Sequence, residues 1–230
     1  MALIFLLVFC FIAFAAGLIA DQALDESRML DKMIEYADTS LTQVDMAEYP
    51  KLVSSITGYL SGRFDTAQVD VIKGDRMVPA FTDNELLHLR DIKDLLGLSH
   101  TLKHMALTLI ISSFILSFPL KKKEPILFGE IKPLVIFNWA AGIILAILMG
   151  VFLWGFIDFE NLFIAFHQLL FRNDLWLLDP QTDLLLQLMP LGFFISYGVD
   201  IIKQNGVLII LLPVALAALN IIKRRQHEIS

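Results

Sequence analysis

Four long apolar runs constrain this chain more than any other feature of its sequence. They cover residues 2–20, 101–120, 134–157 and 206–222, and apolar residues make up 57% of all positions. A helix needs roughly 20 consecutive apolar residues to cross the hydrocarbon core of a bilayer. The runs therefore predict a mainly α integral membrane protein with four transmembrane helices, the first of them at 1–20.

The first run also has features of a cleaved signal peptide. Small residues between Ala13 and Gly17 resemble a cleavage site, but no basic residue precedes the run. A retained transmembrane helix is therefore the preferred interpretation. Cys10 lies within this run and is the single cysteine of the chain, which excludes an internal disulfide and a thiolate metal site.

Basic residues are concentrated in two places along the chain. They follow the second and fourth runs: Lys121, Lys122, Lys123, Lys132, Lys223, Arg224 and Arg225. Because lysine and arginine accumulate in short cytoplasmic loops, the loop 121–133 and the tail 223–230 are predicted to be cytoplasmic. The segments 21–100 and 158–205 are then extracytoplasmic, and both termini lie inside.

The first outer segment, 21–100, is acidic, with 15 acidic and 8 basic side chains. This excess of negative charge argues against nucleic acid as a partner. Apolar residues have helical spacing over 24–36 and 46–60, whereas 68–72 alternates like a strand that could pair with 77–81. The segment is predicted to be a small extracytoplasmic α+β domain, too short to bury a large core without the membrane part.

A further helix is predicted to begin at the end of this domain. Thr82 stands three positions before Glu85, which is the spacing of a capping box. Gly97 and Ser99 are predicted to interrupt the helix before the transmembrane helix 101–120 begins.

The second outer segment, 158–205, mixes apolar and polar residues. Residues 163–171 and 182–189 have the spacing of short helices, and Asp179 before a proline is typical of a turn. Both helices are too short to cross a bilayer, so they are predicted to be interfacial or to dip into the bundle. Trp176 is then expected to be an interfacial anchor.

Two histidines, one from each outer segment, are the main candidates for chemistry. His88 stands three positions after Glu85 and three before Asp91, and His167 precedes several acidic residues. A histidine beside lipid is costly unless it is hydrogen-bonded or used in function. The spacing alone therefore predicts two histidines that converge at the outer interface.

Ordinary structural roles remain open for these polar residues. A hydrogen bond to a backbone carbonyl would account for a buried His167, and the capping box would account for Glu85. Asp174 and Asp183 have positions that suit N-caps of short helices, and Asp179 suits a turn.

A metal site is not predicted. His100 and His104 have the i, i+4 spacing of zinc-binding pairs on helices. However, no glutamate follows His100 as metalloprotease chemistry requires, and the sequence nearby offers no third ligand.

Two segments carry a resemblance to a known family. Residues 85–93 read ELLHLRDIK, and residues 166–180 read FHQLLFRNDLWLLDP. They resemble the two signatures of the bacterial lipoprotein intramolecular transacylases, and the second continues to Phe194. The order of spans and outer segments also resembles that family over essentially the whole chain. The family pattern leads us to expect an acidic residue after Pro190, and this chain departs from it with Leu191.

The resemblance implies an acyltransferase of the bacterial cytoplasmic membrane whose active site faces the outer leaflet. Such enzymes act on lipoproteins whose N-terminal cysteine carries an S-diacylglyceryl group. They move the sn-2 acyl chain to the α-amino group of the same cysteine and so give the lyso-form lipoprotein. The implied partners are the lipoprotein N-terminus and membrane lipid, with no cofactor, metal or external acyl donor; the oligomeric state stays open.

The resemblance also implies that His88 and His167 form the catalytic pair. The α-amino group of the substrate has a pKa of about 8, so a neutral histidine is suited to remove its proton. We assign His167 as the base and His88 as the oxyanion donor or the acid for the leaving glyceryl oxygen. Arg172 or Asn173 is expected to hold the oxyanion or a glyceryl oxygen. The residues expected to orient an imidazole or to support the site are Glu85, Asp91, Asp174, Trp176 and Asp179.

Two other functions remain open from the sequence. An intramembrane metallohydrolase would use the same histidines with a carboxylate, and a lipoprotein chaperone or scaffold would use neither. A transporter is disfavoured because no charged residue stands in the middle of a predicted span, where ion pathways usually place one.

Overall fold

The computed structural model describes residues 2–117 and 133–206, which divide into two compact units. Of the described residues, the first unit contains 2–18, 99–117, 133–157 and 202–206, and the second contains 19–98 and 158–201. The predicted cytoplasmic tail 223–230, nearly all of the predicted fourth span 206–222 and nearly all of the loop 121–133 lie outside the described residues.

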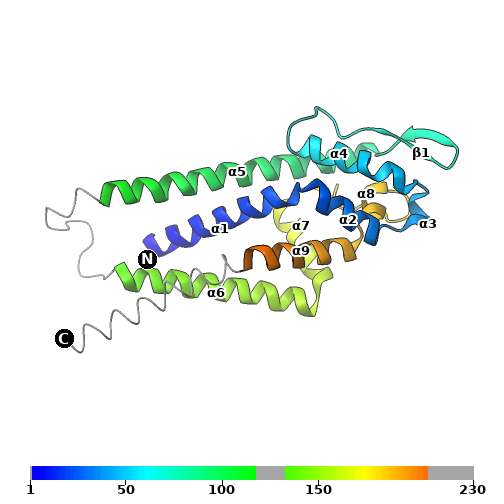
Figure 1. The fold of residues 1–230 in the computed structure, drawn as a ribbon. Helices are drawn as coiled ribbons and strands as arrows, with labels where there is room; N and C mark the ends of the chain where they lie inside the picture. Colours follow the sequence, from blue (N-terminus) through cyan, green and yellow to red (C-terminus); the bar gives the residue numbers. More distant parts are fainter. Residues whose placement is uncertain (1, 118–132, 207–230) are drawn as a thin grey trace, which may run out of the picture. The chain divides into compact units, whose positions relative to one another are not determined.

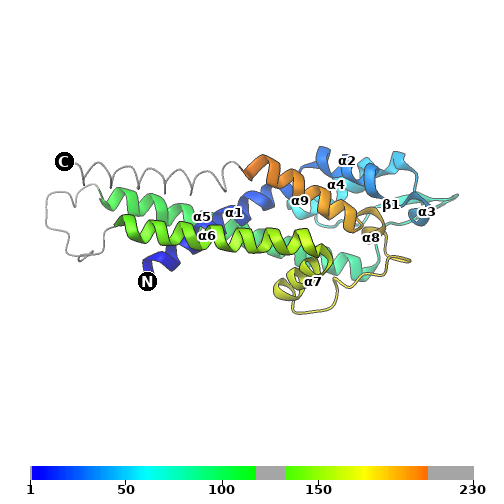
Figure 2. The same ribbon diagram turned by 90° about the horizontal axis from the view of Figure 1, so that it is seen from below.

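Three helices of the described residues are long and apolar enough to cross a membrane. They are α1 (Ala2–Ala23), α5 (Asp83–Ser117) and α6 (Pro133–Ile157), with candidate spans at Ile4–Ala23, Asp83–Ser112 and Trp139–Ile157 (Figure 1). They contain the first, second and third predicted runs. In the first unit, α1 runs beside both α5 and α6 (Figure 2).

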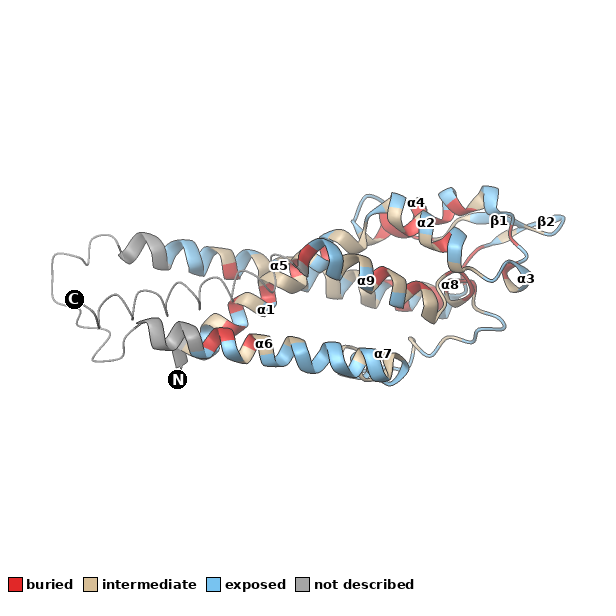
Figure 3. Ribbon diagram, turned by 60° about the horizontal axis from the view of Figure 1, so that its bottom comes forward, coloured by how far each residue is buried: buried red, intermediate tan, exposed pale blue. Residues whose placement is uncertain are grey.

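Buried apolar residues form the contacts between these helices. Val8 of α1 packs with Ala140 and Ile144 of α6, and the small residues Cys10 and Ala13 of α1 pack with Ala106 of α5. Cys10 therefore has the role of a small buried apolar residue. The second half of α6 is mostly exposed and apolar, as expected of a surface that faces lipid (Figure 3).

The predicted interruption at Gly97 and Ser99 is wrong, because α5 continues through both residues for 35 residues in all. Gly97 is exposed, and a Cβ there would have no heavy atom within 4 Å. A glycine inside a helix costs only about 1 kcal/mol relative to alanine, which the hydrogen bonds on either side outweigh. His88 therefore stands on the same unbroken helix as the second apolar run.

The second unit begins with two helices that contribute several residues to its core. They are α2 (Glu26–Tyr36) and α4 (Tyr49–Leu60), separated by the short helices α3 (Thr39–Thr42) and η1 (Met46–Glu48). Tyr49, Leu52 and Ile56 of α4 are almost completely buried, together with Met33 of α2. The helices predicted at 24–36 and 46–60 are thus confirmed, although the second begins as a 3₁₀ turn.

The predicted hairpin is confirmed as the two-stranded antiparallel sheet of the described residues. Strands β1 (Asp70–Lys73) and β2 (Arg76–Pro79) pair with Asp70 opposite Pro79 and Lys73 opposite Arg76. The turn between them requires Gly74, whose φ of 61° is strained for other residues.

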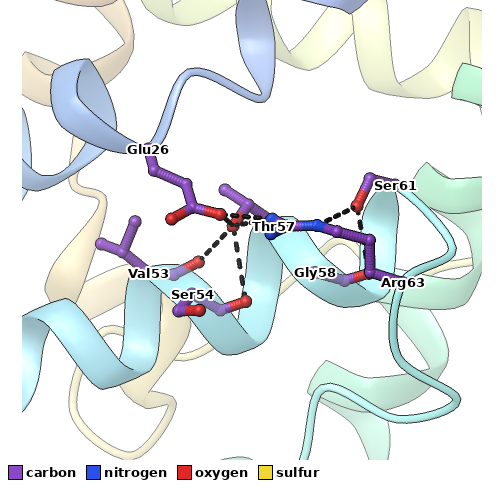
Figure 4. Close-up of polar contacts among 7 residues, drawn as sticks. All are labelled: Glu26, Val53, Ser54, Thr57, Gly58, Ser61 and Arg63. Carbon is purple, nitrogen blue, oxygen red and sulfur yellow. Dashed lines mark hydrogen bonds and ion pairs between the residues drawn. The ribbon is translucent and has the colours of Figure 1, made fainter.

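A polar network joins α2 to the C-terminal end of α4 (Figure 4). The Thr57 hydroxyl lies 3.0 Å from Glu26 Oε1 and 2.8 Å from the Val53 carbonyl oxygen, and Arg63 forms an ion pair with Glu26. Hydrogen bonds from Arg63 and Thr57 lower the pKa of Glu26. The network holds α2 against α4, whose side chains pack in the same core.

Three further helices lie in the second unit. They are α7 (Phe159–Leu170), α8 (Leu184–Leu188) and most of α9 (Leu191–Gly206), and a loop without helix or strand connects α7 to α8. The short helices predicted at 163–171 and 182–189 correspond to α7 and α8, whereas α9 had no counterpart in the sequence analysis. Tyr197 of α9 donates a hydrogen bond to the carbonyl oxygens of Gln22 and Ala23, at 3.1 and 3.2 Å.

Candidate active site

His88 and His167 lie together in the second unit. Their ring centroids are 6.1 Å apart and their ring planes differ by 38°. His88 lies in the first turns of α5 and is 5% exposed, and His167 lies in the last turn of α7 and is 9% exposed. The predicted convergence of the two histidines is therefore present in the structure.

A backbone hydrogen bond fixes the His167 ring. Its Nδ1 lies 2.8 Å from the carbonyl oxygen of Phe163, one helical turn earlier. A carbonyl oxygen only accepts, so Nδ1 carries the hydrogen of the neutral ring and Nε2 keeps a lone pair. The structural role considered for His167 is thus real, and it leaves Nε2 able to accept a proton.

Burial keeps His167 uncharged. Removal from water lowers the pKa of His167, and its hydrogen bond to the Phe163 carbonyl offsets this in part. Two imidazoles this close in apolar surroundings also disfavour simultaneous charge. At neutral pH, His167 is therefore in the form that a general base requires.

His88 is less well satisfied. Its Nδ1 is buried and has no hydrogen-bond partner among the residues that the structure describes. Such a group costs roughly 1–3 kcal/mol when it stays unpaired. The Phe171 ring packs edge-on against the imidazole with centroids 5.4 Å apart, so the immediate surroundings are apolar.

Aromatic rings surround His167. The centroid distances are 4.2 Å to Phe163, 5.1 Å to Trp176 and 5.6 Å to Phe171. Trp176 was expected to be a membrane anchor, and in the structure its ring packs on His167. Apolar rings and the lone pair of His167 Nε2 thus occur at one place.

Asp91 and Asn173 are brought together from the two signature segments. Asn173 Nδ2 donates to Asp91 Oδ2 at 2.8 Å, and Asn173 Oδ1 accepts from the Leu175 backbone N–H at 3.1 Å. The Asp91 carboxylate therefore contacts an amide in the following loop. The amide of Asn173 is engaged at both ends, which makes it a weaker candidate for an oxyanion than the exposed Arg172.

Glu85 is fully buried and caps the N-termini of two helices. Its Oε2 accepts from the Thr82 N–H at 2.7 Å, as the capping box predicts, and its Oε1 accepts from the Leu185 N–H at 2.6 Å. The second bond was not predicted. Asp183 has the N-cap position of α8, but its carboxylate accepts the Asp179 N–H at 2.7 Å, so Glu85 supplies the cap. No sequence signal connects residues 100 positions apart in this way.

The remaining acidic candidates lie in turns. Asp179 Oδ1 accepts from the Gln181 N–H at 2.8 Å, which confirms the predicted turn. The carbonyl oxygen of the exposed Asp174 accepts from the Leu177 N–H at 3.0 Å. Within the described residues, His, Cys, Asp and Glu form no group of three that could hold a metal ion.

Three solved structures share the fold of this chain. One is the membrane-integral lipoprotein intramolecular transacylase Lit from Bacillus cereus, with a TM-score of 0.66 at 19% sequence identity over 97% of this chain and 94% of that chain. Two variants of the same protein, in which a histidine is replaced by arginine or by alanine, give TM-scores of 0.62 and 0.58 at 18% identity. They cover 98% and 99% of this chain and 93% of each variant.

The family follows from the sequence itself. A family model described as lipoprotein intramolecular transacylase Lit matches residues 1–194, and the chain belongs to this family. No protein in the curated set matches the chain significantly.

The chain is therefore a membrane protein and an acyltransferase. It catalyses intramolecular acyl transfer on a lipoprotein, from the glyceryl ester to the α-amino group of the N-terminal cysteine, and gives the lyso-form product. The metallohydrolase and scaffold alternatives are not favoured by these findings.

Proposed function

We propose that His88 and His167 carry out this acyl transfer, with His167 as the base. The observation that supports the proposal is the 6.1 Å separation of two buried imidazoles that come from different signature segments. Rings this close leave both imidazoles near one place, so one bound reacting group could contact both of them.

His167 Nε2 accepts the proton of the substrate amine. The amine nitrogen attacks the carbonyl carbon of the sn-2 ester, and the C–N bond forms as an oxyanion develops. The C–O bond then breaks, and the glyceryl oxygen receives a proton from the imidazolium or from His88. The proton lost by nitrogen is gained by oxygen, so the reaction needs no water and no second acyl donor.

His88 acts on the oxygen side of this reaction. Its unpaired Nδ1 is a buried polar atom beside His167, and a bound substrate would satisfy it. A donor placed at a developing oxyanion typically lowers the barrier by about 3–4 kcal/mol. Because amine and ester belong to one molecule, proximity contributes roughly 7–11 kcal/mol more when the two are aligned.

The site faces the outer leaflet in this proposal. The basic residues near the predicted cytoplasmic loop and tail and the acidic excess in 21–100 support this orientation. Exposed apolar side chains of the same segment are available to the acyl chains and to surrounding lipid: Phe166, Leu169 and Leu177. Arg172, exposed in the same segment, is the candidate contact for the glyceryl oxygens.

Tandem mass spectrometry of the product tests the assignment. Purified protein in detergent is incubated with a synthetic S-diacylglyceryl-cysteinyl peptide, and fragmentation locates the acyl chain, since migration leaves the mass unchanged. We expect N-acylated product from the wild type and at least about 10³-fold less from His88→Ala and His167→Ala. His104→Ala, an exposed histidine elsewhere on α5, is the matched control.

Two results contradict the proposal. Full activity in either site variant, with the control also active, removes that histidine from the mechanism. Loss of activity with a chelator in the wild type, restored by added zinc, favours the metallohydrolase chemistry instead.

A further inference from the structure

The loop between α7 and α8 covers the histidine pair. Residues 171–183, here named the covering loop, contain no helix or strand, and they supply the rings of Phe171 and Trp176 that pack on His88 and His167. Ordering a loop of this length opposes folding by roughly 1–2 kcal/mol for each residue. Specific contacts must therefore hold it in place.

Two carboxylates of α5 hold the ends of this loop. Near its start, Asn173 donates to Asp91 at 2.8 Å, and just after its end the Leu185 N–H donates to Glu85 at 2.6 Å. Glu85 and Asp91 stand three residues before and after His88, which corresponds to about 4.5 Å of helix rise on each side. The two attachments therefore flank the catalytic imidazole.

We propose that Glu85 and Asp91 are positioning residues that clamp the covering loop across His88 and so set the separation of the two imidazoles. The inference rests on the proposed function because it concerns the geometry of that pair. In it, Asp91 acts through Asn173 and not on an imidazole. Glu85 joins the start of α5 to the start of α8, and its cap at Thr82 makes the same carboxylate serve both helices.

The Asp91–Asn173 pair allows a reversal test. Asn173→Asp places two carboxylates together and breaks the attachment, and we expect kcat to fall about 10–100-fold, as for a small misplacement of catalytic groups. Adding Asp91→Asn reverses donor and acceptor, and we expect activity within about 3-fold of the wild type because a paired amide and carboxylate are restored. Asp94→Asn, exposed one turn further along α5, is the matched control.

Fluorescence measures the loop without turnover. In a background with Trp139→Phe and Trp154→Phe, Trp176 is the only tryptophan, and its ring lies 5.1 Å from His167. A charged imidazole quenches a neighbouring indole, so emission is expected to fall as His167 gains a proton at acid pH. Asn173→Asp should weaken this pH-dependent change, and the reversed pair should restore it.

Glu85→Gln tests the other attachment by the same emission change. The amide keeps one oxygen to accept one backbone N–H and presents its own N–H to the other, so we expect a partial loss of the change. Because Glu85 is fully buried, the thermal unfolding of this variant is also measured. If the variant fails to fold, the Asp91–Asn173 pair remains the decisive test.

Three outcomes overturn the clamp. They are an unchanged emission titration in Asn173→Asp, full activity in that variant, and no recovery in the reversed pair, which would show that one side chain acts directly. If His88→Ala and His167→Ala were active, the proposed function would fail while the emission titration still measured the clamp. The two failures are therefore distinguishable.

Discussion

At His167, one hydrogen bond fixes both the orientation of the ring and the position of its hydrogen. The Phe163 carbonyl binds Nδ1 and orients the ring, which leaves Nε2 as the nitrogen that can take a proton. Burial among aromatic rings lowers the pKa of His167, so the neutral form is maintained at neutral pH. The same residue would look like an ordinary satisfied histidine if its neighbours were ignored.

This ionisation predicts a particular pH profile. The substrate amine must also be neutral, and its pKa is about 8. Between this pH and the lowered pKa of His167, log kcat/KM should fall with a slope of one as the pH falls. Below the pKa of His167, which lies under the usual value of about 6.5, the slope should become two.

The control for this profile is the rate of His167→Gln at each pH, measured by stopping the reaction with acid at fixed times. Its residual rate should keep a slope of one throughout the acid range. A second slope that persists in the variant would assign the ionisation to another group. Folding stability should also decrease below about pH 6.5, because the unfolded imidazole binds protons more tightly than the folded one.

At the scale of elements, α5 bears residues of the candidate site in its first turns and packs on α1 in its later part. Its N-terminal part bears Glu85, His88 and Asp91, and its later part packs on α1 through Ala106. The capping box defines where the helix starts. The free-energy cost of one exposed glycine, Gly97, is too small to end the helix. A local motif predicted the first boundary correctly, and a local motif predicted the interruption wrongly.

The contact of α1 with α5 depends on Gly17. A Cβ at this position would lie 2.6 Å from Cβ of Lys103, so the helices would have to move apart. We expect Gly17→Ala to reduce the stability of the detergent-solubilised protein by about 1–3 kcal/mol, measured as a lower midpoint of thermal unfolding.

Gly150→Ala on α6 is the matched control. A Cβ there meets no heavy atom within 4 Å, and alanine favours a helix by about 1 kcal/mol over glycine. Its midpoint should be unchanged or higher. Equal midpoints for the two variants would contradict a close contact at Gly17.

At the scale of the whole molecule, the chain alternates between two units. Residues 19–98 and 158–201 form the unit that contains the site, and the candidate membrane spans lie mostly in the other. A reaction on a lipid-anchored peptide requires this combination, because its substrate has a polar reactive end and acyl chains that stay in the bilayer.

The orientation of the chain can be measured by cysteine labelling. With Cys10→Ala as background, Asp75→Cys places a thiol in the exposed hairpin turn, and Ser230→Cys places one at the C-terminus. A membrane-impermeant maleimide added to intact cells should label the first and not the second, because the positive-inside rule predicts a cytoplasmic C-terminus. The opposite labelling pattern would reverse the proposed topology.

The sequence by itself determined the membrane class, the hairpin, the capping box and the two histidines. These features depend on local quantities: apolar length, alternation, a three-residue spacing and the chemistry that an imidazole brings. The family signatures pointed to the same histidines. Each of these can be recognised without knowing which segments meet.

Only the tertiary structure decided what these residues contact. It paired Asp91 with Asn173, gave Glu85 a second helix to cap, and packed Trp176 on His167. These contacts join segments far apart in the chain, and their partners depend on how the helices pack. Spacing along the sequence defines which face of a helix a residue occupies, whereas packing defines what that face meets.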